Sequence, residues 1–172
     1  MPDYAVTAIG RDRPGIVAAI SRALLDFGGN IEGSQMSMLG GQFAVMLVVG
    51  VGPETAEDEL SARLGSVRDE LGLQALTFTP VEEAAATLSE PTHRLRIQGR
   101  DRPGMIATAS AVLAGHGANI VDLESRIAGE GTEATSTVVL RIDLSDAEEA
   151  EVEAALQQAA AEMELEVNLS PL

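Results

Sequence analysis

Residues 10–16 read Gly-Arg-Asp-Arg-Pro-Gly-Ile, and residues 99–105 repeat them as Gly-Arg-Asp-Arg-Pro-Gly-Met. A second signal follows at the same distance in both copies, as Gly28-Gly29-Asn30-Ile31 and Gly117-Ala118-Asn119-Ile120. Both signals recur after 89 residues, so no gap falls between them. A period of this length predicts two copies of a small domain rather than a solenoid.

The first copy is typical of a βαββαβ unit. Apolar runs and helical spacing predict strands over 4–9, 30–39, 43–49 and 73–79, and helices over 14–27 and 53–71. Pro14 suits the first position of a helix, and Gly40-Gly41 suits a hairpin turn. The run Phe43–Val49 is apolar at every position, so we expect both of its faces to be covered, one of them by the other domain or another chain.

The second copy repeats this order. We expect strands over 94–98, 119–127, 135–144 and 163–169, and helices over 103–115 and 145–162, the latter opened by a capping box from Ser145 to Glu148. The predicted fold class is α+β, with two ferredoxin-like βαββαβ sandwiches whose antiparallel sheets carry both helices on one face. The predicted domains span residues 1–80 and 92–172, with a linker over 81–91.

Composition excludes several classes of protein. The net charge of −16 argues against direct nucleic-acid binding, which needs a basic face. The chain has no cysteine, no apolar stretch long enough to span a membrane, and no basic-then-apolar leader, so we expect a cytoplasmic protein that does not contact membranes. His93 and His116 lack partner ligands at metal spacing, so we expect no metal and no cofactor.

The repeated loop has the chemistry of an anion site. Each loop leads into a helix whose first N–H groups lack intrahelical partners and carry part of the positive dipole end, which suits a carboxylate. Four of the eleven arginines lie in the two loops. We take the first and second strands of a unit to run antiparallel, which puts Asn30 at the end of the sheet away from the loop. One copy then need not close the pocket, and a neighbouring copy could.

Each of these residues also has a purely structural interpretation. Asp12 and Asp101 could cap the free amides of the helix. Asn30 and Asn119 could simply follow a helix stop, where asparagine tolerates unusual backbone angles. Arg13 and Arg102 could be solvated or paired with the neighbouring aspartates.

The combination of these motifs resembles the ACT domain family. The matching residues are Asp12–Ile16 after the first strand and Gly28–Ile31 at the start of the second, with Asp101–Met105 and Gly117–Ile120 in the second copy. Met105 replaces isoleucine and Ala118 replaces glycine, and both departures are mild. A chain made of two such domains is similar to the glycine cleavage system transcriptional repressor family.

The resemblance implies a non-enzymatic regulatory protein that senses a small ligand, usually an amino acid, between paired ACT units. It also implies a homodimer and a partner protein such as a transcription factor of amino-acid or one-carbon metabolism. Carried over by the motif, the ligand-binding positions are Asp12, Arg13, Pro14, Gly15, Ile16, Asn30 and Ile31 in the first copy, and Asp101, Arg102, Pro103, Gly104, Met105, Asn119 and Ile120 in the second.

Two other functions remain open. A purely structural interaction module would keep the motif for folding alone. An acylphosphatase-like enzyme shares the βαββαβ order, an arginine in the first loop and an asparagine on the second strand. Pro14 argues against the enzyme because it removes one N–H from the phosphate cradle, and the loop lacks that family's glycine pattern.

Overall fold

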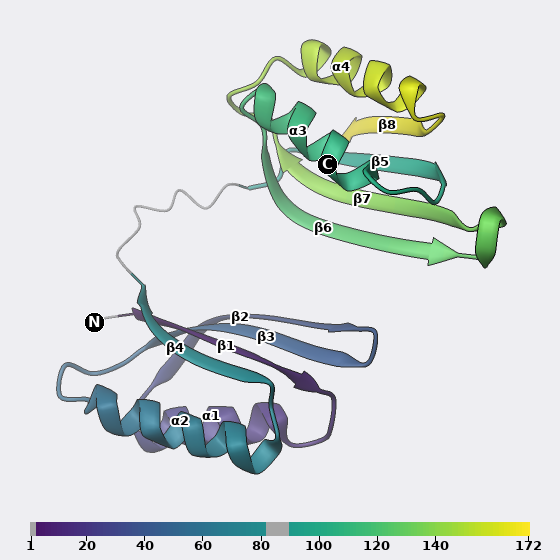
Figure 1. The fold of residues 1–172 in the computed structure, drawn as a ribbon. Helices are drawn as coiled ribbons and strands as arrows, with labels where there is room; N and C mark the ends of the chain where they lie inside the picture. The colour runs from purple at the N-terminus through teal and green to yellow at the C-terminus, as the bar shows by residue number, and fades with distance from the viewer. Residues whose placement is uncertain (1–2, 82–89) are drawn as a thin grey trace. The chain divides into compact units, whose positions relative to one another are not determined.

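The computed structural model describes residues 3–81 and 90–172 (Figure 1). The chain divides into two compact units, residues 1–85 and 86–172. Residues 82–89 of the predicted linker over 81–91 lie outside the described residues, so its bounds stay a prediction. Each unit is considered by itself below.

The first unit has the predicted βαββαβ order. Its elements are β1 (Asp3–Arg11), α1 (Ile16–Asp26), β2 (Asn30–Leu39), β3 (Gln42–Gly50), α2 (Glu57–Leu71) and β4 (Ala75–Val81). The β2–β3 turn is Gly40-Gly41, as predicted, and both glycines have positive φ angles, 58° and 76°, which a two-residue hairpin turn of this kind requires.

The strands form one sheet in the order β2-β3-β1-β4, and α1 and α2 cover one of its faces (Figure 1). Both β1 and β2 pair antiparallel with β3, so β1 and β2 run parallel to each other. The expectation that they run antiparallel was therefore wrong. The predicted position of Asn30, at the end of the sheet away from the loop, is nevertheless correct, and it follows from the parallel direction. Asn30 and Asp3 both face Gly50 at one end of the sheet, while Arg11 and Leu39 face Gln42 at the other.

The second unit repeats this topology. Its elements are β5 (His93–Arg100), α3 (Met105–Gly115), β6 (Asn119–Ala128), the 3₁₀ turn Gly131–Glu133, β7 (Thr135–Asp143), α4 (Glu149–Glu162) and β8 (Glu166–Pro171), with sheet order β6-β7-β5-β8. Two antiparallel four-stranded sheets with helices on one face confirm the predicted α+β class.

The capping box predicted for α4 was wrong. The helix begins at Glu149 behind Glu148, and no side chain caps its first amides. Ser145 lies earlier, where both its backbone N–H and its hydroxyl donate to Asp143 Oδ1, at 2.9 and 2.5 Å. A serine that bonds back to an aspartate two residues earlier forms a local turn, which competes with capping.

The two cores differ in composition. All four aromatic residues lie in the first unit, where the rings of Tyr4 and Phe78 stack with centroids 4.3 Å apart. Phe43 is also buried there. The second core is aliphatic, built around residues such as Leu95, Leu140 and Leu156.

The two units also differ on the face of the sheet opposite the helices. In β3, Phe43, Val45, Leu47 and Val49 point to the helices and are buried, while Met46 and Val48 point away and remain 53% and 37% exposed. The second cover expected for this run does not come from within the unit. In β7 the outward positions include Arg141, so that face is more polar than its counterpart in β3.

No helix within residues 3–81 or 90–172 combines the length and apolar character that a membrane span needs.

Candidate ligand site at the motif loops

Each motif loop turns into its helix through a left-handed glycine. Gly15 precedes α1 with φ 96° and Gly104 precedes α3 with φ 98°, a region that side-chain-bearing residues rarely adopt. The helices begin at Ile16 and Met105, so Pro14 lies one residue before the cap and not at the first helical position as predicted. The left-handed glycine followed by a helical residue turns successive N–H groups toward one concavity, a form that binds anions.

The tips of both helices are bare in the described structure. No side chain hydrogen-bonds to the capping amides of α1 or α3, and neither helix has an acidic residue in its first turn. Asp12 and Asp101 therefore do not cap the helices, and that structural alternative was wrong. Two helix N-termini with unmet donors and no anion from the protein are suited to an external carboxylate.

The motif arginines reach away from their aspartates. Arg13 Nη2 donates to the backbone oxygen of Glu70 in the last turn of α2, at 3.0 Å. Arg102 Nη2 pairs with Glu164 Oε2 just after α4, at 3.3 Å. These contacts fasten each loop to the end of the unit's second helix, where the negative end of the dipole favours a cation.

The second motif lies far from the first within each unit. Asn30 and Asn119 are exposed first residues of β2 and β6, and Ile31 and Ile120 follow them. Each strand is ten residues long, so its two ends are about 30 Å apart at the usual rise per residue. A unit thus groups Asp12–Ile16, or Asp101–Met105, but not the asparagine segment with them, and a single site containing both segments stays a prediction.

The first glycine of each motif has a packing role that the sequence did not reveal. A Cβ at Gly10 would lie 2.8 Å from Leu73 Cδ2 and 3.1 Å from Leu73 Cα, and a Cβ at Gly99 would lie 2.6 Å from Leu165 Cδ2. These glycines let the chain before β4 and β8 approach β1 and β5 closely.

A pocket opens beside the tip of α3 in the second unit. It has a volume of about 510 Å³, counted with the solvent at its mouth, and is lined by Asp101, Arg102, Gly104, Met105, Ile106, Ala107, Ser125, Ile127, Ser136 and Val138. Four of these residues lie on β6 and β7, and the sequence analysis missed them. The signal that could have found them is strand alternation, which puts Ser125 and Ser136 on the helix-facing side of the sheet.

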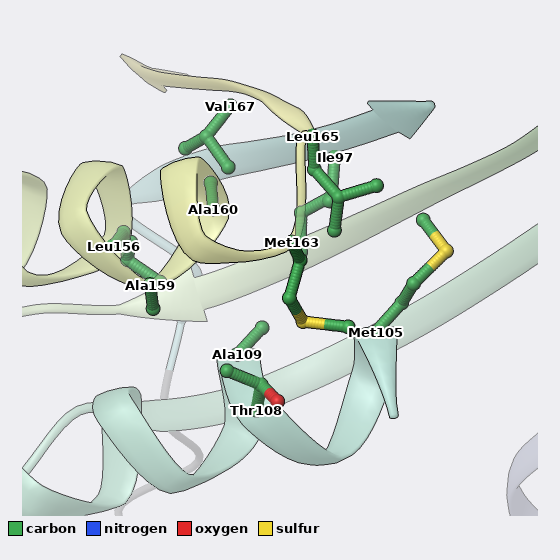
Figure 2. Close-up of a pocket in the computed structure, with 10 residues that line it drawn as sticks. All are labelled: Ile97, Met105, Thr108, Ala109, Leu156, Ala159, Ala160, Met163, Leu165 and Val167. Carbon is green, nitrogen blue, oxygen red and sulfur yellow. The ribbon is translucent and has the colours of Figure 1, made fainter. Parts of the chain in front are cut away.

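Met105 also borders a second hollow, inside the core. Figure 2 shows this apolar crevice between α3, α4 and the sheet, with Met105 and Met163 at the same end. The space within it that a water-sized sphere can reach is only about 10 Å³, and small residues such as Ala109 and Ala159 line it. Met105 thus borders both the pocket at the helix tip and this narrow crevice.

Metal chemistry has no candidate among the described residues, where no group of three or more His, Asp or Glu side chains is placed to hold an ion. His93 instead lies 3.5 Å from Glu149 and 2.9 Å from the hydroxyl of Thr92, and His116 Nδ1 lies 2.8 Å from the backbone oxygen of Val112.

Comparisons with known proteins agree with this architecture. A family model described as an ACT domain matches residues 4–77, and a second model of the same description matches residues 93–161. The glycine cleavage system transcriptional repressor of Escherichia coli (strain K12) is 31% identical over 125 residues, which are 70% of this chain and 63% of that protein. The aligned region is thus less than two thirds of that relative's length.

Solved structures match over the full chain. A Galdieria sulphuraria protein, described only as unknown, superposes with a TM-score of 0.77 at 27% identity, over 99% of this chain and 98% of that one. A protein proposed to be a glycine cleavage system transcriptional repressor superposes with the same TM-score of 0.77 at 16% identity, over 99% and 97% of the two chains. At that identity the second match shows the fold alone.

Proposed function

Because this chain belongs to the ACT domain family and carries two ACT domains in tandem, we propose that it is a regulatory protein whose motif loops bind a small amino acid. The observation that carries the proposal is the pair of uncapped helix tips, each behind a left-handed glycine. The amides bind the α-carboxylate, and the exposed Asp12 or Asp101 is the acceptor nearest in sequence for the ammonium group. Asn30 and Asn119 of a neighbouring unit close the site over the ligand.

The test is calorimetry of the full chain against the twenty common amino acids. We expect saturable binding of at least one of them. The double variant Asn30→Ala/Asn119→Ala should weaken that binding at an unchanged melting temperature, because both side chains are exposed at strand starts. Absence of binding by folded protein would refute the sensor. If the double variant bound the amino acid as tightly as the wild type, the two asparagines would not be part of the site.

A partner protein completes the proposed function. We infer that the chain acts on a transcriptional regulator of amino-acid or one-carbon metabolism, because its curated relative is a glycine cleavage system repressor and the net charge of −16 disfavours direct contact with DNA. In the native host, deletion of the gene should change transcript levels of the glycine cleavage genes, and the purified chain alone should not shift their promoter DNA. Unchanged transcripts would refute this partner.

Edge strands are the proposed dimer contacts. β2 and β6 are sheet edges with exposed apolar side chains, such as Met36 at 55% and Ile127 at 64%. Unpaired edges with apolar side chains favour strand pairing, which an inserted lysine blocks. We expect a dimer by light scattering, and a monomer for Met36→Lys or Ile127→Lys. A wild-type monomer would refute the dimer, and two dimeric variants would exclude the edges.

A further inference from the structure

The two motif sites differ in the residues beneath the helix tip. By strand register, Ser136 of β7 lies between Gly99 and Ile127, and Phe43 of β3 lies between Gly10 and Met38. Ser136 and Phe43 therefore occupy equivalent positions in the two units. In the first unit the Phe43 ring is only 2% exposed and fills the space that a serine leaves open in the second.

On the edge strand, too, a serine of the second unit corresponds to a large apolar residue of the first. Ser125 pairs with Val138, and its counterpart Met36 pairs with Val45. The first unit thus presents two large apolar side chains where the second presents two hydroxyls. Both serines line the pocket together with the first turn of α3.

Ser136 is the observation that points to a ligand. It is 5% exposed, it lines the pocket, and within the described part of the chain its hydroxyl has no hydrogen-bond partner. The hydroxyl opens into the pocket, so a ligand that covers it must hydrogen-bond to it or leave it buried and unmet, which is destabilising. The walls beside it, Ile127 and Val138, are apolar, so an apolar ligand would bury the hydroxyl still unmet.

From this asymmetry we propose that the ligand site of the second unit selects an α-amino acid with a short hydroxyl-bearing side chain, and that the first unit's equivalent is closed to it. The inference rests on the proposed amino-acid sensing, and it assigns ligand binding to the motif loop of the second unit. The carboxylate lies on the amides of α3 and the ammonium faces Asp101. The side chain inserts between Ser125 and Ser136. A site built for a hydroxyl discriminates strongly against the isostere that lacks one.

The experiment is calorimetry of the full chain with two matched pairs of probes, L-serine against L-alanine and L-threonine against L-valine. We expect one ligand per chain, and the hydroxyl member of each pair to bind at least tenfold more tightly. Ser136→Ala should reduce that preference about five- to tenfold, as expected for one lost hydrogen bond. Ser125→Met, which imports the first unit's residue at an exposed position, should abolish binding.

The control is Ser61→Met, the same chemical change at an exposed position of α2 in the first unit, which should leave stoichiometry and affinity unchanged. Circular dichroism checks the fold of each variant, and Ser125→Met keeps the test decisive should Ser136→Ala lose structure. Two ligands per chain, or equal affinity for both members of each pair, would overturn the inference while leaving the sensor intact. Failure of all twenty amino acids to bind would instead overturn the proposed function itself.

Discussion

Covering the open side of the crevice of Figure 2 with added carbon atoms should stabilise the second unit. Ala159 lies on the face of α4 that borders this crevice, and it is half-buried. Ala159→Val adds two carbons, which contribute about 1.6 kcal/mol if they become buried. The branched side chain lowers helix propensity by about 0.5 kcal/mol. The net expectation is a gain of about 1 kcal/mol in the free energy of unfolding.

Ala154→Val is the matched control, because Ala154 is exposed on the same helix. It carries the propensity term without the burial term, so it should destabilise the unit by about 0.5 kcal/mol. The two variants should therefore differ by about 1.6 kcal/mol.

Urea unfolding can assign these changes to the second unit. Tyr4 is the single tyrosine and there is no tryptophan, so intrinsic fluorescence reports on the first unit, while far-ultraviolet circular dichroism reports on both. The shift should occur in the dichroism transition and not in the fluorescence transition. If Ala159→Val were no more stable than Ala154→Val, the added carbons would not be buried at the crevice and the reasoning would fail.

Three further predictions concern single contacts. Glu164 has φ 51° at an exposed position, and its carboxylate pairs with Arg102. Both Glu164→Gly and Glu164→Ala lose this pair, but only the glycine variant relieves about 1 kcal/mol of left-handed backbone strain. Urea unfolding should therefore find the glycine variant more stable than the alanine variant by about that amount. Gly10→Ala should destabilise the first unit by about 1–3 kcal/mol in urea unfolding, because the added Cβ clashes with Leu73. Gly33→Ala is the control: its Cβ would lie 3.7 Å from Val48, so the loss of stability should be smaller. The Tyr4 hydroxyl donates to Glu57, and this hydrogen bond raises the pKa of Tyr4, so stability from this pair is present below pH about 10 and is lost as pH rises through the folded-state pKa. Tyrosinate absorbance should therefore titrate above that value in the wild type and nearer to it in Glu57→Gln; identical titrations would contradict the role of the bond.

Much of the fold could be predicted because the repeat fixed the alignment of two copies. Gly40-Gly41 marked the hairpin, and apolar runs and helical spacing marked the strands and helices around it. The starts of the helices could not be placed as well. Pro14 and Ser145 are both acceptable near a helix start, and a left-handed glycine or a local turn decided the boundary at each place.

The candidate site was predicted only in part. Its loops followed from a linear motif, and the structure leaves their helix tips bare. The floor of the pocket comes from Ser136 on β7, the strand next to β5, and from Ser125 on β6, the strand beyond it. Only the pairing register brings these two serines under the helix tip. The partners of Arg13 and Arg102 were also unpredictable, because they lie 57 and 62 residues further along the chain.

The motif loop and the asparagine lie at opposite ends of each sheet, so ligand affinity measured at several protein concentrations is informative. A ligand that contacts a motif loop and an asparagine segment holds two units together, so its affinity is linked by mass action to the association of those units. Where the two units belong to separate chains, apparent affinity falls as protein concentration falls, and ligand in turn drives assembly. Where both belong to one chain, the effective concentration is set by tethering and the affinity is independent of dilution.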